Sequence, residues 1–163
     1  MAPYTLIPHC STLIAPFLHQ EAQRLGVLSA VIFTGQLPRQ QALRYVEDAD
    51  VCVSPFYPTP VLNSASPTKL VEYMAMGKAV VANTHPEQKL LIDQSGCGYC
   101  VPYEEEAFAA AIVELLRAPQ LAREMGERGR RYVVEHRAYG VIATGVEREM
   151  LRIAGKDVAA ASI

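Results

Sequence analysis

Several features that mark particular protein classes are missing from this sequence of 163 residues. It has no tryptophan, 7% aromatic residues, and no apolar run of about 18 residues that could span a membrane. Fifteen basic and seventeen acidic residues give a formal charge of −2, so the positive excess that nucleic-acid binders use is lacking. Four cysteines are too few for a disulfide framework at this length. We therefore expect a globular, cytoplasmic protein that does not bind nucleic acid.

The sequence does contain a regular alternation of apolar, β-branched runs and amphipathic segments. Buried strands are predicted over residues 30–33, 50–54, 79–82 and 98–101. Helices are predicted over residues 20–26, 38–49, 66–76, 86–93, 104–117, 121–136 and 140–154. Short, continuously apolar strands that alternate with helices are typical of a parallel sheet covered on both faces, which is a Rossmann-like α/β fold.

The same patterns divide the chain into three parts. Residues 1–19 have no clear hydrophobic period and are expected to be an irregular N-terminal segment. They are not expected to be a signal peptide, because they lack its basic region. Residues 20–155 are expected to form one domain, followed by a frayed tail over residues 156–163. In parallel sheets ligands bind at the carboxyl ends of the strands, so the loops at 35–37, 55–66 and 83–86 are the places to search for a site.

The segment from Asn63 to Ala82 carries the most chemical information. Ser66 is a natural N-cap and Pro67 a natural first helical residue, so the N–H groups of the first turn would form an anion site suited to phosphate. Lys69 adds a positive charge there, and Glu72, one turn later on the same face, could accept hydrogen bonds from sugar hydroxyls. The alternative interpretation is that Lys69 and Glu72 form an ordinary surface pair at i,i+3.

An ordered set of motifs resembles one known family. Val31–Gly35, Ala49–Val51, Pro67–Ala82 and Cys97–Pro102 are together similar to the C-terminal, donor-binding domain of GT-B-fold retaining glycosyltransferases of family four. The resemblance covers roughly residues 20–150 in consistent order. It implies the C-terminal half of a GT-B fold.

The resemblance also implies a ligand and the residues that bind it. The ligand is a nucleotide-diphosphate sugar, with Glu72 on the ribose hydroxyls and no metal or other cofactor. The start of the helix would lie by the diphosphate, and a second loop would lie near the base. The residues concerned are Ser66, Pro67, Thr68 and Lys69 for the diphosphate, and Gly35, Gln36 and Leu37 for the base.

Two departures from the family pattern shape this expectation. The family has a glutamate near the transferred sugar, eight residues before the ribose-binding one, and here that position is Ser64. Residues 1–19 contain neither the glycine-containing strand nor the basic diphosphate clamp that open the family domain, and the acceptor domain is not found. We therefore expect an N-terminally truncated donor-binding half that works with a missing N-terminal acceptor domain. A lipid-linked acceptor would bring it to the inner membrane face.

A non-enzymatic interpretation stays open beside this one. The chain could be a non-catalytic or incomplete Rossmann-like module that needs a partner domain. A sugar-nucleotide epimerase of the same architecture is a third interpretation, but no residue supports it.

Other polar residues are better explained without a site. Cys97 and Cys100 have redox-motif spacing, but they span a turn and a strand, and no second pair completes a zinc site. His85 could face a bound sugar or be a loop histidine without a role. A cluster of arginines is interpreted as a solvated face, with contact to an anionic membrane as the alternative: Arg128, Arg130 and Arg131.

Overall fold

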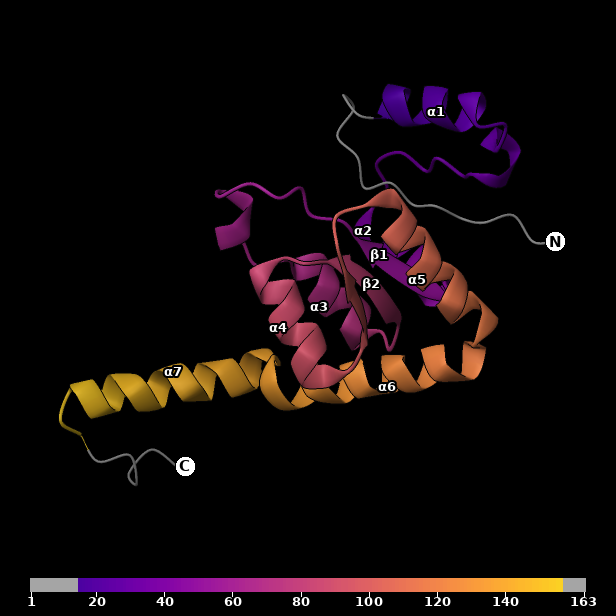
Figure 1. Cartoon of the computed structure of the whole chain (residues 1–163). Helices are drawn as coiled ribbons and strands as arrows, with labels where there is room; N and C mark the ends of the chain where they lie inside the picture. Colours follow the sequence, from indigo (N-terminus) through magenta and orange to yellow (C-terminus); the bar gives the residue numbers. More distant parts are fainter. Residues whose placement is uncertain (1–14, 157–163) are drawn as a thin grey trace. The chain divides into compact units, whose positions relative to one another are not determined.

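The computed structural model describes residues 15–156 (Figure 1). It divides into two compact units, Met1–Ala49 and Asp50–Ile163, which are described separately below. In the described part of the chain, no helix has the length and apolar character needed to cross a membrane.

The first unit is helical in its described residues. It contains α1 (Ala15–Arg24), the 3-10 helix η1 (Leu28–Ala30) and α2 (Arg39–Asp48). Helix α1 begins inside the segment expected to be irregular, while residues 1–14 lie outside the described residues. Gly35 has a φ of +63°, which turns the chain just before α2.

The strand predicted over residues 30–33 is wrong. Ala30 ends η1, and the extended backbone after it belongs to no strand of the described sheet. Ile32 is 40% exposed, unlike a residue of a central strand. An apolar, β-branched run favours an extended backbone, but a strand also needs a neighbour to accept its hydrogen bonds.

The second unit contains a parallel sheet of three strands in its described residues. They are β1 (Val51–Ser54), β2 (Ala79–Asn83) and β3 (Gly98–Val101), in the order β1-β2-β3. Val51 pairs with Ala79, and Val80 pairs with Gly98. These strands lie within one residue of their predicted positions, and their parallel pairing confirms the expected Rossmann-like sheet.

Helices cover both faces of this sheet (Figure 1). The described helices of the second unit are η2 (Leu62–Ser64), α3 (Thr68–Ala75), α4 (Pro86–Ser95), α5 (Glu105–Arg117), α6 (Pro119–His136) and α7 (Tyr139–Ile153). On one face, Ala79 and Val81 pack against Leu115 of α5 and Met125 of α6. The other face is covered by α3 and α4, whose side chains Leu70, Met74 and Leu91 are fully buried.

The middle of α6 packs against the turns that precede β2 and β3, at the amino edge of the sheet. A Cβ built on Gly126 would overlap the carbonyl oxygen of Gly77. A Cβ on Gly129 would lie 2.7 Å from the Cβ of Cys97. Two mid-helix glycines therefore let α6 approach the sheet at backbone distance.

Arg128 belongs to the same contact, which corrects the prediction of a solvated arginine face. Its Nε donates a hydrogen bond to the carbonyl oxygen of Gly96, at 3.0 Å, just beyond the C-terminus of α4. A cation at that position complements the helix dipole. Arg130 and Arg131 are exposed, as predicted.

Candidate functional site

The carboxyl edge of the sheet carries a cluster of buried polar side chains. Ser54 ends β1, Asn83 ends β2, and His85 and Gln88 lie at the start of α4. All four are between 0 and 3% exposed. Polar side chains this deeply buried need hydrogen-bond partners, and in this cluster many of the partners belong to the loop that follows β1.

Asn83 holds the backbone of Phe56 with two hydrogen bonds. Its Oδ1 accepts from the N–H of Phe56 at 2.6 Å, and its Nδ2 donates to the carbonyl oxygen of Phe56 at 2.9 Å. Gln88 completes the cluster, because its Nε2 donates to the carbonyl oxygen of Asn83 at 3.2 Å and its Oε1 accepts from the hydroxyl of Ser54 at 2.6 Å. The first residues of the loop are thus fixed by side chains of β1, β2 and α4.

His85 fixes the other end of the loop. Its Nδ1 accepts the N–H of Gln88 at 3.5 Å and caps α4, so Nε2 is the nitrogen that donates to the carbonyl oxygen of Leu62, at 2.9 Å. The ring also packs against Phe56, with centroids 4.9 Å apart. His85 is therefore a positioning residue for the loop, a role that the sequence did not reveal.

The start of α3 differs from the prediction by one residue. Pro67 is the N-cap, with a ψ of 85° that is not helical, and the helix begins at Thr68. No side chain caps the helix, so the prediction of Ser66 as N-cap is wrong. The N–H of Thr68 donates to the carbonyl oxygen of Ser66 at 3.0 Å, and the N–H of Leu70 donates to the carbonyl oxygen of Pro67 at 3.0 Å.

These bonds reduce the anion site that the sequence predicted. Pro67 has no N–H, and those of Thr68 and Leu70 are engaged within the turn. The N–H of Lys69 makes no backbone hydrogen bond within residues 15–156. An anion at this helix start would therefore meet the N–H and the ammonium group of Lys69.

The predicted site residues of the second unit share an exposed surface around this helix start. Pro67 is buried, whereas the polar members of the set are exposed: Ser64, Ser66, Thr68, Lys69 and Glu72. The opposite face of α3 is held in the core by Leu70 and Met74. The hydroxyl of Ser64 donates to the carbonyl oxygen of Val61 at 2.7 Å.

The residues predicted to lie near the base belong to the first unit. Gly35 and Gln36 are exposed and Leu37 is half-buried, in the turn that leads into α2. The structure thus brings together the predicted residues from Ser64 to Glu72, while Gly35, Gln36 and Leu37 lie in a separate unit.

Two exposed tyrosines at the carboxyl edge were missed in the sequence. Tyr57 follows Phe56 in the loop after β1, and Tyr103 follows β3. Their rings make an edge-to-face pair with centroids 5.8 Å apart, although Tyr57 is 63% exposed and Tyr103 is 45% exposed. A pair of aromatic residues in two turns after apolar strands is the signal that could have identified them.

Cys97 and Cys100, whose spacing is that of a redox motif, show no sign of redox chemistry in the described part of the chain. Cys97 and Cys100 form no disulfide with each other, and burial raises the pKa of both thiols. A reactive cysteine needs the opposite shift, because the thiolate is the nucleophile. Within residues 15–156 no three His, Cys, Asp or Glu side chains are grouped so that they could hold a metal.

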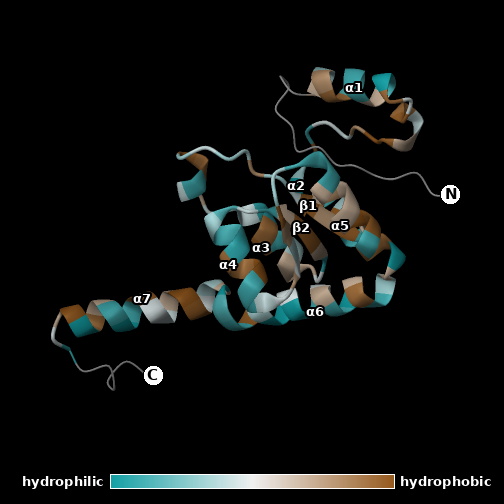
Figure 2. Cartoon of the chain, in the orientation of Figure 1, coloured by the Kyte–Doolittle hydropathy of each residue, from teal (hydrophilic) through white to brown (hydrophobic). Residues whose placement is uncertain are grey.

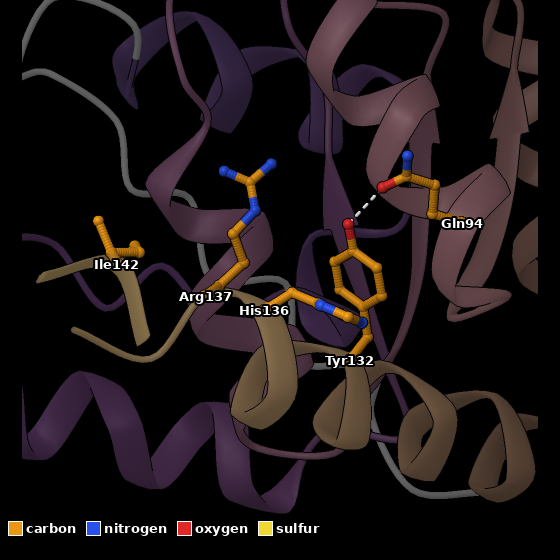
Figure 3. Close-up of a pocket in the computed structure, with 5 residues that line it drawn as sticks. All are labelled: Gln94, Tyr132, His136, Arg137 and Ile142. Atoms are coloured by element: carbon orange, nitrogen blue, oxygen red, sulfur yellow. Dashed lines mark hydrogen bonds between the residues drawn. The ribbon is translucent and has the colours of Figure 1, made fainter. Parts of the chain in front are cut away.

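A recess of about 580 Å³ lies away from this edge, between α4, α6 and α7 (Figure 3). It is lined by Gln94, Tyr132, His136, Arg137 and Ile142, and the hydroxyl of Tyr132 is hydrogen-bonded to Gln94. None of these residues belongs to the set predicted from the sequence. The recess is therefore separate from the surface around Lys69 and Glu72.

Comparisons with known proteins agree with this architecture. Among solved structures, sucrose-phosphate synthase from Thermosynechococcus elongatus superimposes with a TM-score of 0.77 at 24% identity, covering 94% of this chain and 39% of that chain. WaaG, a glycosyltransferase involved in lipopolysaccharide biosynthesis, superimposes with a TM-score of 0.69 at 20% identity and covers 88% of this chain and 36% of that chain. HepE from Anabaena, in complex with UDP, superimposes with a TM-score of 0.71 at 19% identity and covers 90% of this chain and 40% of that chain. No curated protein matches the sequence.

These structures share the fold, and the chain spans only 36 to 40% of their length. The family itself is shown by a match between residues 13–118 and the model for glycosyl transferases of group 1. The match includes the whole segment from Ser64 to Glu72 together with all three strands. The chain belongs to the group 1 glycosyl transferases.

Proposed function

We propose that this chain is the donor-binding domain of a glycosyltransferase and that it binds a nucleotide-diphosphate sugar at the carboxyl edge of its sheet. The observation that carries the proposal is the family match over residues 13–118, because it contains the loop after β1 and the whole of α3. HepE, which shares the fold, was solved with UDP, and this supports a nucleoside diphosphate as part of the ligand.

The exposed face of α3 has the chemistry that such a ligand requires. Lys69 supplies a positive charge and a backbone N–H that makes no backbone hydrogen bond within residues 15–156, and both can meet the diphosphate. Glu72 lies one helical turn further on, where a carboxylate would be repelled by the phosphates but can accept hydrogen bonds from the two ribose hydroxyls. In this proposal Ser64, at the end of η2, takes the place of the family glutamate beside the transferred sugar. That Gly35, Gln36 and Leu37 bind the base stays a prediction from the family resemblance.

The buried polar cluster would serve this site by fixing the loop. Asn83 and His85 hold the loop at Phe56 and Leu62, so Ser64 and the start of α3 are presented from a rigid support. Pre-organised ligand contacts lose less conformational entropy on binding. No metal is needed in this scheme, because Lys69 and the helix start take on the diphosphate charge.

The proposed reaction moves the sugar to an acceptor with retention of its configuration. We propose that a second domain, of the kind that the longer solved structures have room for, supplies the acceptor side. Without such a domain the chain would act as a binding module only, which is the second candidate function. The exposed Arg130 and Arg131 would suit contact with an anionic membrane if the acceptor is lipid-linked.

Calorimetric titration of the full chain with UDP, GDP and ADP tests the proposal. We expect one of the three to bind, and the Glu72→Ala variant to bind it at least about tenfold more weakly, since hydrogen bonds to a charged group are lost. Glu124→Ala is the matched control, because Glu124 is an exposed helical glutamate of α6 and its loss should leave affinity unchanged. Absence of binding at millimolar nucleotide would contradict the proposal.

A further inference from the structure

The tyrosine pair at the carboxyl edge presents open aromatic faces. The planes of the Tyr57 and Tyr103 rings stand at 89° to each other, in an edge-to-face contact. In such a contact the ring that contributes its edge keeps both of its faces free of the other ring, and the second ring keeps one. Both side chains are exposed, so these faces can be reached from solvent.

Both tyrosines lie in tight turns of the backbone. The N–H of Thr59 donates to the carbonyl oxygen of Tyr57 at 2.9 Å. In the turn after β3, the N–H of Glu104 donates to the carbonyl oxygen of Pro102 at 2.8 Å, across Tyr103. Each tyrosine is also the direct neighbour of a proline, which restricts the backbone further. The two rings are therefore held in place before a ligand binds, which lowers the entropy cost of binding.

The charged residues next to the pair in the sequence are acidic. No charged residue lies within five positions of Tyr57, and Tyr103 is followed directly by Glu104, Glu105 and Glu106. All three glutamates are exposed, and Figure 2 shows that the turn into α5 is hydrophilic. Carboxylates accept hydrogen bonds from hydroxyl groups and repel phosphate. The chemistry of the pair and its surroundings therefore favours a neutral ligand that is rich in hydroxyl groups.

We propose that Tyr57 and Tyr103 bind a neutral sugar ring of the acceptor. The C–H groups on one face of the sugar pack against the electron-rich face of a tyrosine ring, and its hydroxyl groups donate to the carboxylate of Glu104. This inference rests on the proposed function, because an acceptor site has a role only beside a bound donor. It specifies the substrate class, an acceptor that ends in a neutral sugar.

The place of the pair suits the acceptor. The loop after β1 leads from Tyr57 to the start of α3 on one face of the sheet, whereas Tyr103 leads into α5 on the other face (Figure 1). The pair joins the loops of β1 and β3, the two strands that flank β2. With the donor diphosphate at Lys69, by the start of α3, the acceptor sugar lies on the side of α5. The two substrates then reach the carboxyl edge from opposite sides.

The donor sugar is a poorer occupant of the pair. It is tied to the diphosphate at Lys69, and the family position beside it is Ser64. Tyr57 and Ser64 lie at opposite ends of the loop, which is held separately at Phe56 and at Leu62. A sugar beside Ser64 is therefore placed by the far end of the loop.

Saturation-transfer difference NMR of the full chain tests the proposal. The probes are the methyl glycosides of glucose, galactose and mannose, which are neutral and carry no phosphate. We expect at least one of them to bind with a dissociation constant on the order of 10 mM, because a single ring makes few contacts. Its ring C–H protons should receive more saturation than its methyl group, because the C–H face is the part that stacks on a tyrosine.

Variants of the tyrosines test where the sugar binds. Tyr57→Ala and Tyr103→Ala should each weaken binding at least about threefold, because a stacked ring is lost. Tyr103→Phe keeps the ring and should keep the affinity within about twofold. Tyr139→Ala is the matched control, because Tyr139 is an exposed tyrosine of α7 and its loss should leave binding unchanged. Circular dichroism checks that each variant is folded. Equal weakening by Tyr139→Ala and Tyr103→Ala would overturn the assignment to the pair.

Calorimetry separates this inference from the proposed function. The nucleoside diphosphate that binds the chain, and its glucose conjugate, should both bind Tyr103→Ala within about twofold of their affinity for the unsubstituted chain. A loss of affinity for the glucose conjugate alone would overturn the acceptor role in favour of the donor sugar. Binding of a nucleotide but of none of the three glycosides would overturn this inference and leave the donor site intact. Binding of a glycoside but of no nucleotide would overturn both.

Discussion

The two edges of the sheet in the second unit are built by different means. At the amino edge, Gly126 and Gly129 bring α6 to backbone distance from the turns before β2 and β3. At the carboxyl edge, Asn83 and His85 hold an irregular loop through hydrogen bonds to its backbone. Close packing suits regular elements that meet, whereas an irregular loop can be held only where its backbone groups find partners. The amino edge therefore supports the fold through packing, and the carboxyl edge leaves an exposed loop that is fixed at two points of its backbone.

The largest effect is expected at the amino edge. Gly126→Ala places a methyl group against the carbonyl oxygen of Gly77, so α6 must move away from the turn before β2. Overpacking against backbone should lower the free energy of unfolding by about 3 kcal/mol. Urea unfolding monitored by circular dichroism measures the change.

The same substitution in α7 provides the control. A Cβ on Gly145 would meet nothing within 4 Å, so Gly145→Ala should be neutral or stabilise the chain by up to about 1 kcal/mol through helix propensity. Equal effects of the two substitutions would show that the close approach of α6 is not what holds the amino edge.

The next effect is expected at the carboxyl edge. Asn83→Ala leaves the N–H and carbonyl groups of Phe56 without their partner, which should cost about 2 kcal/mol. The variant should also bind nucleotide more weakly, because the loop before α3 is no longer fixed. Asn63→Ala removes an exposed asparagine of the same loop and is expected to change stability by less than about 0.5 kcal/mol. If Asn83→Ala altered stability but not affinity, the loop would not position the site.

The two edges also differ in how well the sequence predicts them. The helix predicted over residues 121–136 contains Gly126 and Gly129, and glycine inside a helical pattern is a usable sign of close packing. The rule for parallel sheets directed the search for a site to the carboxyl edge, and Lys69 and Glu72, which the sequence places after β1, are exposed in the structure. That these residues bind a ligand stays a prediction. The sequence was informative where a periodic pattern or a general topological rule applied.

Single residues outside any pattern were less predictable. His85 reads as a loop residue, because nothing local indicates that its ring will meet the carbonyl oxygen of Leu62, 23 residues earlier. The ψ of Pro67, which moves the helix start past Ser66, is set by the loop before it. The apolar run at 30–33 gives no information on whether a neighbouring strand exists. These outcomes depend on tertiary contacts that local propensity does not contain.

The interior between the two edges should respond to alkaline pH. Burial raises the pKa of the Cys52 thiol of β1 from 9.0 to about 12, so the folded chain keeps a proton that the unfolded chain releases. Stability from this group is complete below pH 9 and is lost as the pH rises toward 12, by up to roughly 1.4 kcal/mol per pH unit. Burial also raises the pKa of Tyr73, from 10.0 to about 12, so its contribution is lost only above pH 10.

Unfolding midpoints at pH 8, 9 and 10 measure this dependence. Cys52→Ala should reduce the fall in the unfolding midpoint between pH 9 and 10. Part of the fall should remain, because burial also raises the pKa of the Cys97 and Cys100 thiols. Cys100→Ala is the matched control and should flatten the decline less, because Cys100 is only half-buried. The same decline in Cys52→Ala and the unsubstituted chain would mean that this thiol is not desolvated in the folded state.

The smallest effect concerns the exposed rings of the carboxyl edge. Tyr57 and Tyr103 meet edge to face across two loops, and such pairs couple by about 0.5 kcal/mol when exposed. A double-mutant cycle with alanine at both positions measures that coupling in the free energy of unfolding. A second cycle between Tyr132 and His136, whose ring centroids are 4.7 Å apart within α6, gives the coupling for a pair that a helix holds in place.

The Asn83→Ala background tests what holds the tyrosine pair together. Since the loop after β1 is fixed at Phe56, the residue before Tyr57, the coupling between the tyrosines should fall to zero in this background, whereas the coupling between Tyr132 and His136 should be unaffected. A coupling that survives there would mean that the tyrosines, and not the buried asparagine, hold this part of the loop.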